Sequence, residues 1–204
     1  MEIDHLVVAA RTLEEGTQFV ERLLGVETQP GGQHTRLGTH NRLLNLGDGI
    51  YLEIIAIDPL GNAPFQPRWF GLDSPATQAR LAAGPRLVHW AARTDDIERD
   101  AARGPVSLGP IHPMERGAFK WRITIPADGL PPGDGVVPTL IQWDVDDHPT
   151  RRLPESGCRL QALRATHPNA NAFRDLPFID VHQDSAVRLE AVIATPSGMV
   201  TLAS

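Results

Sequence analysis

Two short apolar segments of the chain each carry one histidine. The first reads IDHLVVAART over Ile3 to Thr12, and the second reads LVHWAART over Leu87 to Thr94. An imidazole inside an apolar strand can act as a proton acceptor or a metal ligand near neutral pH. A stretch that recurs in this way indicates an internal repeat, and a repeat sets the fold.

Each histidine has a polar counterpart in a later apolar strand. Glu53 lies in the run Ile50 to Ile57, and Gln142 lies in the run Val137 to Val145; they follow His5 and His89 by 48 and 53 residues. Side chains alternate between the two faces of a strand. If the two units pair about a pseudo-twofold axis, the two histidines, the glutamate and the glutamine converge.

This set of four has the composition of a metal site. Two neutral imidazoles and one carboxylate suit Zn, Ni, Mn or Fe(II), and the amide oxygen of Gln142 is a weaker fourth ligand. Glu53 is costly to bury unless it is paired or metal-bound, and it is also the candidate catalytic base. The competing interpretation is that His5 and His89 are hydrogen-bonded structural residues, which is the common case for a lone histidine on a strand.

The order of elements repeats around these residues. Residues 1–59 read strand, helix and three strands, with Thr12 as the N-cap of the helix, Glu15 as its capping-box partner and Gly25 at its end. Residues 60–86 form a connector with a short helix that starts at Ser74. The second unit, 87–149, repeats the order with strands expected at 87–93, 106–111, 119–125 and 137–145 and a helix at 95–103.

A weaker third copy covers residues 158–204, with Ala162 in place of the histidine. We therefore expect an α+β fold of βαβββ modules, two full and one degenerate, in one compact domain. The curved mixed sheets would enclose a cleft, with helices on the convex side.

At these residues the chain resembles the vicinal oxygen chelate superfamily, which includes glyoxalases, bleomycin-resistance proteins and extradiol dioxygenases. That resemblance implies metal ligands on the first and fourth strands of each module. Within this superfamily, the chain most resembles the longer, glyoxalase-like branch. Four further segments carry that resemblance: Pro67 to Leu72, Lys120 to Arg122, Pro138 to Trp143 and Leu189 to Leu202. Gln142 departs from the carboxylate that is commonest at its position.

The resemblance implies three functions. The first is a metal-dependent lyase or isomerase that acts on a small carbonyl or hydroxy-acid substrate and stabilises an enediolate by Lewis-acid catalysis. The second is an Fe(II) dioxygenase of the extradiol type. The third is a metal-free protein that binds or sequesters a small molecule.

Four other side chains are candidates for substrate binding. Arg116, Lys120 and Trp121 lie around a strand of the second unit and can form a wall for an anionic substrate, and Arg68 can cover the mouth of a cavity. The competing interpretation is a solvated strand face with a core tryptophan and a packing connector.

The composition limits the partners. The net charge of −6 argues against nucleic acid and anionic membranes. No apolar run approaches the length of a membrane helix, and the lone Cys158 excludes an internal disulfide and fits a reducing compartment. We expect a cytoplasmic protein with a small-molecule substrate, and a homodimer is one expected assembly.

Overall fold

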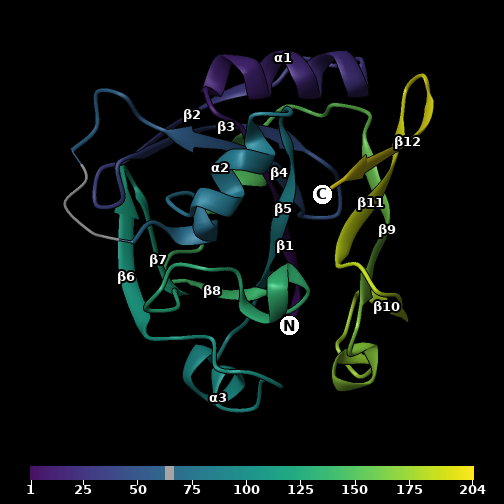
Figure 1. The fold of residues 1–204 in the computed structure, drawn as a ribbon. Helices are drawn as coiled ribbons and strands as arrows, with labels where there is room; N and C mark the ends of the chain where they lie inside the picture. Colours follow the sequence, from purple (N-terminus) through teal and green to yellow (C-terminus); the bar gives the residue numbers. More distant parts are fainter. Residues whose placement is uncertain (63–66) are drawn as a thin grey trace.

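A computed structural model describes residues 1–62 and 67–204 of the chain. Eight strands form one curved mixed sheet in the order β2-β3-β4-β1-β5-β8-β7-β6, as Figure 1 shows. This confirms the α+β fold expected from the sequence. The strands are β1 (Glu2–Ala9), β2 (Gln29–His34), β3 (Thr39–Asn45), β4 (Tyr51–Ile57), β5 (Arg86–Arg93), β6 (Ile111–Arg116), β7 (Phe119–Thr124) and β8 (Thr139–Trp143).

The two halves of this sheet are related by a pseudo-twofold axis between β1 and β5. These two strands are antiparallel, and His5 lies opposite Ala91 while Val7 lies opposite His89. In each half the first strand pairs in parallel with the fourth, β1 with β4 and β5 with β8. The pairing makes His5 and His89 equivalent positions on the same face of the sheet.

The convex face is covered from two sides. Helix α1 (Leu13–Leu24) packs its buried Val20 and Leu24 against β4 and β3, and Thr12 caps it by accepting a hydrogen bond from the Glu15 amide. Gly25 ends the helix in a left-handed conformation with φ of 70°. Both helix ends therefore agree with the sequence prediction. The short helix α3 (Ile97–Ala101) lies against β8 and β7.

The C-terminal segment forms a separate four-stranded sheet on the convex side of β5 (Figure 1). It follows the expected order of elements, but its strand order is β10-β9-β11-β12, so the first strand lies between the second and the third. This pairing differs from that of both modules. The elements are α4 (Pro149–Arg152), β9 (Arg159–His167), η3 (Ala170–Phe173), β10 (Asp180–Gln183), β11 (Arg188–Thr195) and β12 (Gly198–Ala203).

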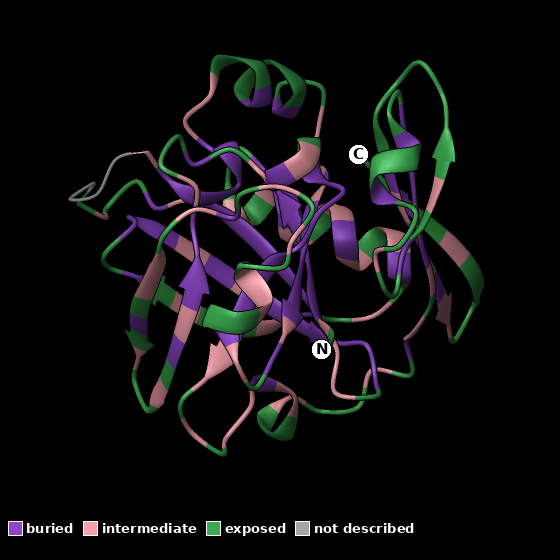
Figure 2. Cartoon of the chain, turned by 90° about the horizontal axis from the view of Figure 1, so that it is seen from below, coloured by how far each residue is buried: buried purple, intermediate pink, exposed green. Residues whose placement is uncertain are grey.

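The concave face is largely filled by the connector. A short 3₁₀ turn, η1 (Trp69–Gly71), and α2 (Pro75–Leu81) pack Trp69, Phe70 and Leu81 against Val7 and other concave residues. These elements therefore lie inside the curve, whereas the sequence predicted helices on the convex side alone. The expectation of an irregular connector also included residues 63–66, which lie outside the described residues. Figure 2 shows the buried strands that this layering produces.

One expected strand is displaced. The sequence predicted a strand at 106–111, but β6 begins only at Ile111. Gly109 has a φ of 78°, which departs from extended backbone and interrupts the strand before Pro110. The proline within β6, Pro113, is tolerated because β6 is an edge strand. Another 3₁₀ turn, η2 (Pro132–Gly135), precedes β8.

Among the described residues, no helix has the length and apolar character needed to cross a bilayer.

Candidate active site

His5 of β1 and Glu53 of β4 face one another on the concave side of the sheet. Both side chains are buried, and Nε2 of His5 lies 3.8 Å from Oε2 of Glu53. This separation is too long for a direct hydrogen bond, so the two groups flank a gap. The sequence predicted both residues, and the parallel pairing of β1 with β4 positions them.

Asp4 orients the His5 ring from behind. Its Oδ1 lies 2.6 Å from Nδ1 of His5, and its Oδ2 accepts hydrogen bonds from Nε1 of Trp143 and Nε2 of His148 at 2.9 and 3.1 Å. A carboxylate only accepts, so Nδ1 of His5 carries a proton, and Nε2 of the ring faces Glu53. Burial opposes the charge of Asp4, but the hydrogen bonds from the two histidines outweigh it and hold its pKa well below the usual range.

A bulge in β1 makes this contact available. Ile3 pairs with Ala92 and His5 pairs with the next residue, Ala91, so Asp4 is an extra residue in the strand. Neighbours in a regular strand point to opposite faces, and a bulge redirects them. The sequence places Asp4 beside His5 but carries no signal for the bulge, which is why sequence reasoning missed Asp4.

On its other side Glu53 belongs to a polar chain that ends at Arg116. Nδ2 of Asn41 donates to Oε1 of Glu53 at 2.6 Å, and a guanidinium nitrogen of Arg116 donates to Oδ1 of Asn41 at 2.9 Å. Nε2 of His34 lies 3.9 Å from the same carboxylate oxygen. Burial, and next the charge of Arg116, lower the pKa of His34 well below its usual value, so this ring is neutral.

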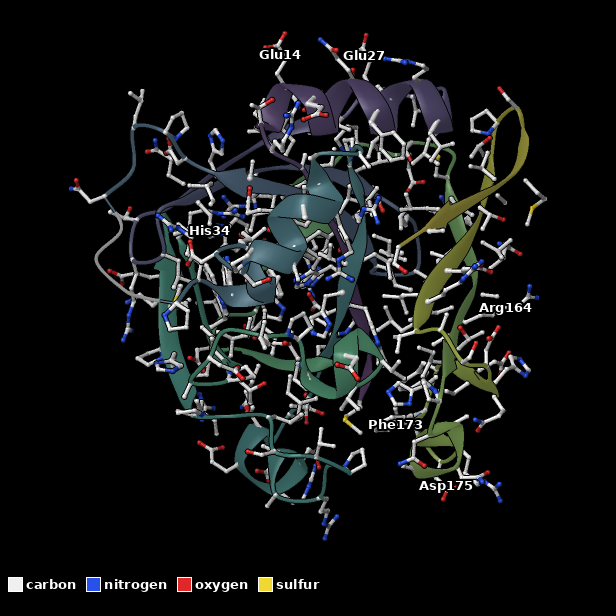
Figure 3. The ribbon with its side chains drawn as sticks, viewed as in Figure 1. Glu14, Glu27, His34, Arg164, Phe173 and Asp175 are labelled. Atoms are coloured by element: carbon white, nitrogen blue, oxygen red, sulfur yellow. The ribbon has the colours of Figure 1, made fainter. Side chains whose placement is uncertain are left out.

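Sequence reasoning did not select His34, which is buried and lies close to β6 (Figure 3). His34 stacks edge-on against Trp69 of the connector, with ring centroids 4.8 Å apart. A non-local contact of this kind leaves no local sequence signal.

These residues enclose a small cavity, which we call the inner chamber. Its volume is about 20 Å³, and polar and aromatic side chains line it together: His5, His34, Asn41, Glu53 and Arg116 with Tyr51, Trp69, Phe70, Trp121 and Trp143. A volume of roughly 10 to 15 Å³ holds one water molecule. The inner chamber therefore has room for a reacting group and not for a whole substrate.

His89 lies on the same concave face but is closed off from the inner chamber. Its Nε2 accepts a hydrogen bond from the Thr139 amide at 3.1 Å and lies 2.9 Å from the Thr139 hydroxyl. The ring of Phe70 covers it at 5.6 Å, from a backbone with φ of 57° that bulky residues rarely adopt. Burial lowers the pKa of His89 to about 3, although a hydrogen bond with the Gly135 backbone acts in the opposite direction.

The pairing register shows why Gln142 does not lie on the same face of the sheet as His5, Glu53 and His89. Val7 pairs with Glu53 in the first module and its counterpart Ala91 pairs with Thr139 in the second, so Thr139 is the equivalent of Glu53. Gln142 shares the convex face with Leu140, and its Oε1 accepts a hydrogen bond from the Ile97 amide of α3 at 2.9 Å. It supports the start of that helix.

The donor atoms fit a divalent metal only in part. His5 with a carboxylate behind it, together with Glu53, has the donor types and outer-shell support of metal ligands. His89 uses its ring lone pair on Thr139, and Gln142 lies on the other face of the sheet. Within residues 1–62 and 67–204, no three His, Cys, Asp or Glu side chains are arranged to hold a metal ion. The four-ligand set predicted from the sequence does not form in this arrangement.

The four predicted substrate-binding residues lie in three places. Arg116 and Trp121 line the inner chamber, while Lys120 is exposed on a groove outside it. Arg68 lies elsewhere: its guanidinium bonds the Asp73 carboxylate at 2.6 Å and the Leu37 carbonyl at 2.9 Å. Arg68 therefore fastens the connector to the loop after β2.

Comparison with known proteins gives a family and a fold. The model of the family described as "Glyoxalase-like domain" matches residues 3–176. A hypothetical protein from Staphylococcus aureus has a similar structure, with a TM-score of 0.58 and 15% identity over 98% of this chain and 84% of that one. At this identity the likeness concerns the fold. No curated protein matches the chain significantly.

Two epimerase structures are more distant. Methylmalonyl-CoA epimerase from Mycobacterium tuberculosis has a TM-score of 0.41 and 16% identity, over 70% of this chain and 86% of that one. A variant of the Streptomyces coelicolor methylmalonyl-CoA epimerase with 2-nitronate-propionyl-CoA has a TM-score of 0.43 and 18% identity, over 73% and 99%.

The family match covers most of the chain, and the paired modules around β1 and β5 are the fold that the match implies. This chain belongs to the glyoxalase-like domain family.

Proposed function

We propose that the protein is an enzyme that moves a proton on a small oxygenated substrate, as an isomerase, epimerase or lyase of carbonyl or hydroxy acids does. The observation that carries the proposal is the gap of 3.8 Å between Nε2 of His5 and Oε2 of Glu53 inside a buried chamber. Two groups that each accept or donate a proton, on either side of one small space, suit removal and return of a proton at a carbon beside a carbonyl.

In this proposal Glu53 takes the proton from carbon and a proton carried on Nε2 of His5 is delivered to the substrate, or Nε2 of His5 takes the proton and a proton carried on Glu53 is delivered. Asp4 keeps Nε2 of His5 directed at the chamber, and Asn41 holds the Glu53 carboxylate in place. Arg116 and Asn41 supply hydrogen-bond donors toward the enolate oxygen that forms when the proton leaves. The aromatic wall limits water in the chamber, which strengthens these electrostatic contacts.

The test is hydrogen exchange. The protein is incubated in D2O with a panel of 2-oxo acids, 2-hydroxy acids and hydroxyketones, and proton NMR follows deuterium at the carbon beside the carbonyl. We expect the wild-type protein to catalyse exchange on at least one compound, and Glu53→Gln and His5→Gln each to reduce the rate roughly 10²- to 10⁴-fold. Glu14→Gln, the same substitution at an exposed helix position, is the matched control.

Binding of panel compounds without exchange on any of them would favour the alternative of a metal-free binding protein. Two further alternatives use a divalent metal: a Lewis-acid lyase and an Fe(II) dioxygenase of the extradiol type. In both, His5 and Glu53 are the candidate metal ligands. The same exchange assay, repeated with a chelator and with added Zn, Ni, Mn or Fe(II), tests them, together with elemental analysis of untagged protein. A stoichiometric metal that is lost in His5→Gln would support a metal-dependent reaction.

A further inference from the structure

The two edge strands of the eight-stranded sheet, β2 and β6, approach one another and nearly close it. Two arginines cross the line between them, which we call the seam. Arg36 donates to the Pro113 carbonyl at 2.9 Å, and Arg116 donates to Oδ1 of Asn41 at 2.9 Å. The edges are therefore held together by cationic side chains.

A groove of about 660 Å³ runs over the seam, lined by residues from the end of β2, the following loop and β6. Two of its residues, His34 and Arg116, also line the inner chamber. The groove and the chamber are thus neighbours, separated by these two side chains.

The volumes decide how a substrate can lie. Small-molecule sites commonly occupy roughly 300 to 1,000 Å³, whereas the inner chamber has about 20 Å³. Only the reacting end of a substrate fits between His5 and Glu53. The body of the molecule must lie outside, and the adjoining groove has a volume in the usual range.

The charge of the groove indicates which chemical group of a substrate it can bind. Arg36, Arg116 and Lys120 line it together with a single carboxylate, Glu115, while the whole chain carries a net charge of −6. A local excess of positive charge on an acidic protein attracts anions. Guanidinium groups bind carboxylate and phosphate oxygens through paired hydrogen bonds.

We propose that the seam groove binds an oxyanion of the substrate, a carboxylate or a phosphate, and directs the reacting end into the inner chamber. Arg116 would exchange its bond to Asn41 for one to the anion. The proposal rests on the proposed function in taking the chamber as the reaction site, but anion binding in the groove can be measured without any turnover.

Lys120 makes a direct test possible because it is the sole lysine in the sequence. An amine-reactive reagent labels it and the N-terminal amine, and peptide mass spectrometry follows both rates. The probes are pyrophosphate and malonate, compared with chloride at equal ionic strength. We expect either oxyanion to slow labelling of Lys120 several-fold while the N-terminal amine is unaffected, and the stronger probe identifies phosphate or carboxylate as the preferred group.

Arg36→Gln is expected to weaken this protection, because it removes one of the cations that line the groove. The matched control is Arg164→Gln, an exposed arginine on β9, far from β6 (Figure 3). Equal labelling of Lys120 in chloride and in both oxyanions would overturn the groove proposal, and so would protection that persists unchanged in Arg36→Gln.

The two proposals fail separately. Protection of Lys120 in a protein that exchanges no panel compound would leave the groove standing and overturn the proton-transfer reaction. If the protein catalyses exchange that Glu53→Gln abolishes, but no oxyanion protects Lys120, the proton-transfer reaction stands and the groove proposal is overturned.

Discussion

Asp4 shows how much of a site can depend on one residue that is not in the chamber. Its carboxylate accepts hydrogen bonds from the buried His5 and from the half-buried Trp143 and His148. Because these donors favour the ionised form, the low pKa of Asp4 stabilises the fold above about pH 4, the value in an unfolded chain, and that contribution is lost as the pH falls below it.

Asp4→Asn is expected to reverse the tautomer of His5. The new amide nitrogen can donate to Nδ1, which moves the ring proton to Nε2. We expect proton exchange to fall roughly 10²- to 10⁴-fold, and nitrogen NMR of the imidazole to show the change of protonated atom. Asp180→Asn, at an exposed position on β10, is the control. An unchanged His5 tautomer in Asp4→Asn would contradict this role.

At the scale of elements, the positions on β5 and β8 that correspond to His5 and Glu53 are His89 and Thr139, and these two side chains bond each other. Thr139 stands where the first module has Glu53, and it hydrogen-bonds His89 through both its amide and its hydroxyl. Phe70 of the connector covers the His89 ring on the concave face. The result is a one-sided chamber in which β1 and β4 supply His5 and Glu53, the proposed acid–base pair.

The buried His89 predicts a pH dependence of stability. Its pKa is about 3 in the fold, mainly because of burial, and about 6.5 in an unfolded chain. A depressed pKa means that its contribution is fully present above about pH 6.5 and is lost as the pH falls toward 3, by up to about 1.4 kcal/mol per pH unit. His34, whose pKa is also lowered, adds to this slope.

His89→Gln keeps an acceptor for the Thr139 amide but does not titrate. Urea unfolding between about pH 7 and pH 4 should therefore show a smaller loss of stability on acidification in this variant than in the wild-type protein. His182→Gln, at an exposed position, should keep the wild-type slope. A slope that His89→Gln leaves unchanged would show that His89 titrates normally.

At the scale of the whole molecule, the C-terminal sheet shares a hydrophobic core with the two modules. Leu189, Ala191 and Leu202 of this sheet are buried in the same core as Leu6 and Trp90 of the central strands. The family match, which extends to residue 176, includes part of this sheet. The sheet therefore supports β1 and β5 from the convex side while the site occupies the concave side.

Two leucine-sized residues on β12 provide a test of this support. Leu202 is 1% exposed and Met199 is 61% exposed. Leu202→Ala should lower the free energy of unfolding by about 2 to 5 kcal/mol, through lost burial and a cavity, and Met199→Ala should change it little. Chemical denaturation of both variants measures this difference. Equal effects would mean that the C-terminal sheet does not share the core.

The sequence by itself determined the features that depend on local pattern. The two modules, the caps of α1 and the start of α2 follow from strand and helix periodicity and from capping residues, and His5 and Glu53 could be selected as a facing pair. Local pattern is sufficient there because each feature depends on neighbouring residues or on the simple alternation of a strand.

The tertiary structure decided which groups meet. The bulge at Asp4, the register that puts Thr139 in the place expected for Gln142, and the connector that fills the cleft arise from contacts between distant segments. A shift of one residue in register moves a side chain to the other face of a sheet, so spacing along the sequence could not assign Gln142. For the same reason His34 and Arg116 become neighbours only where the sheet curves round and its two edges approach.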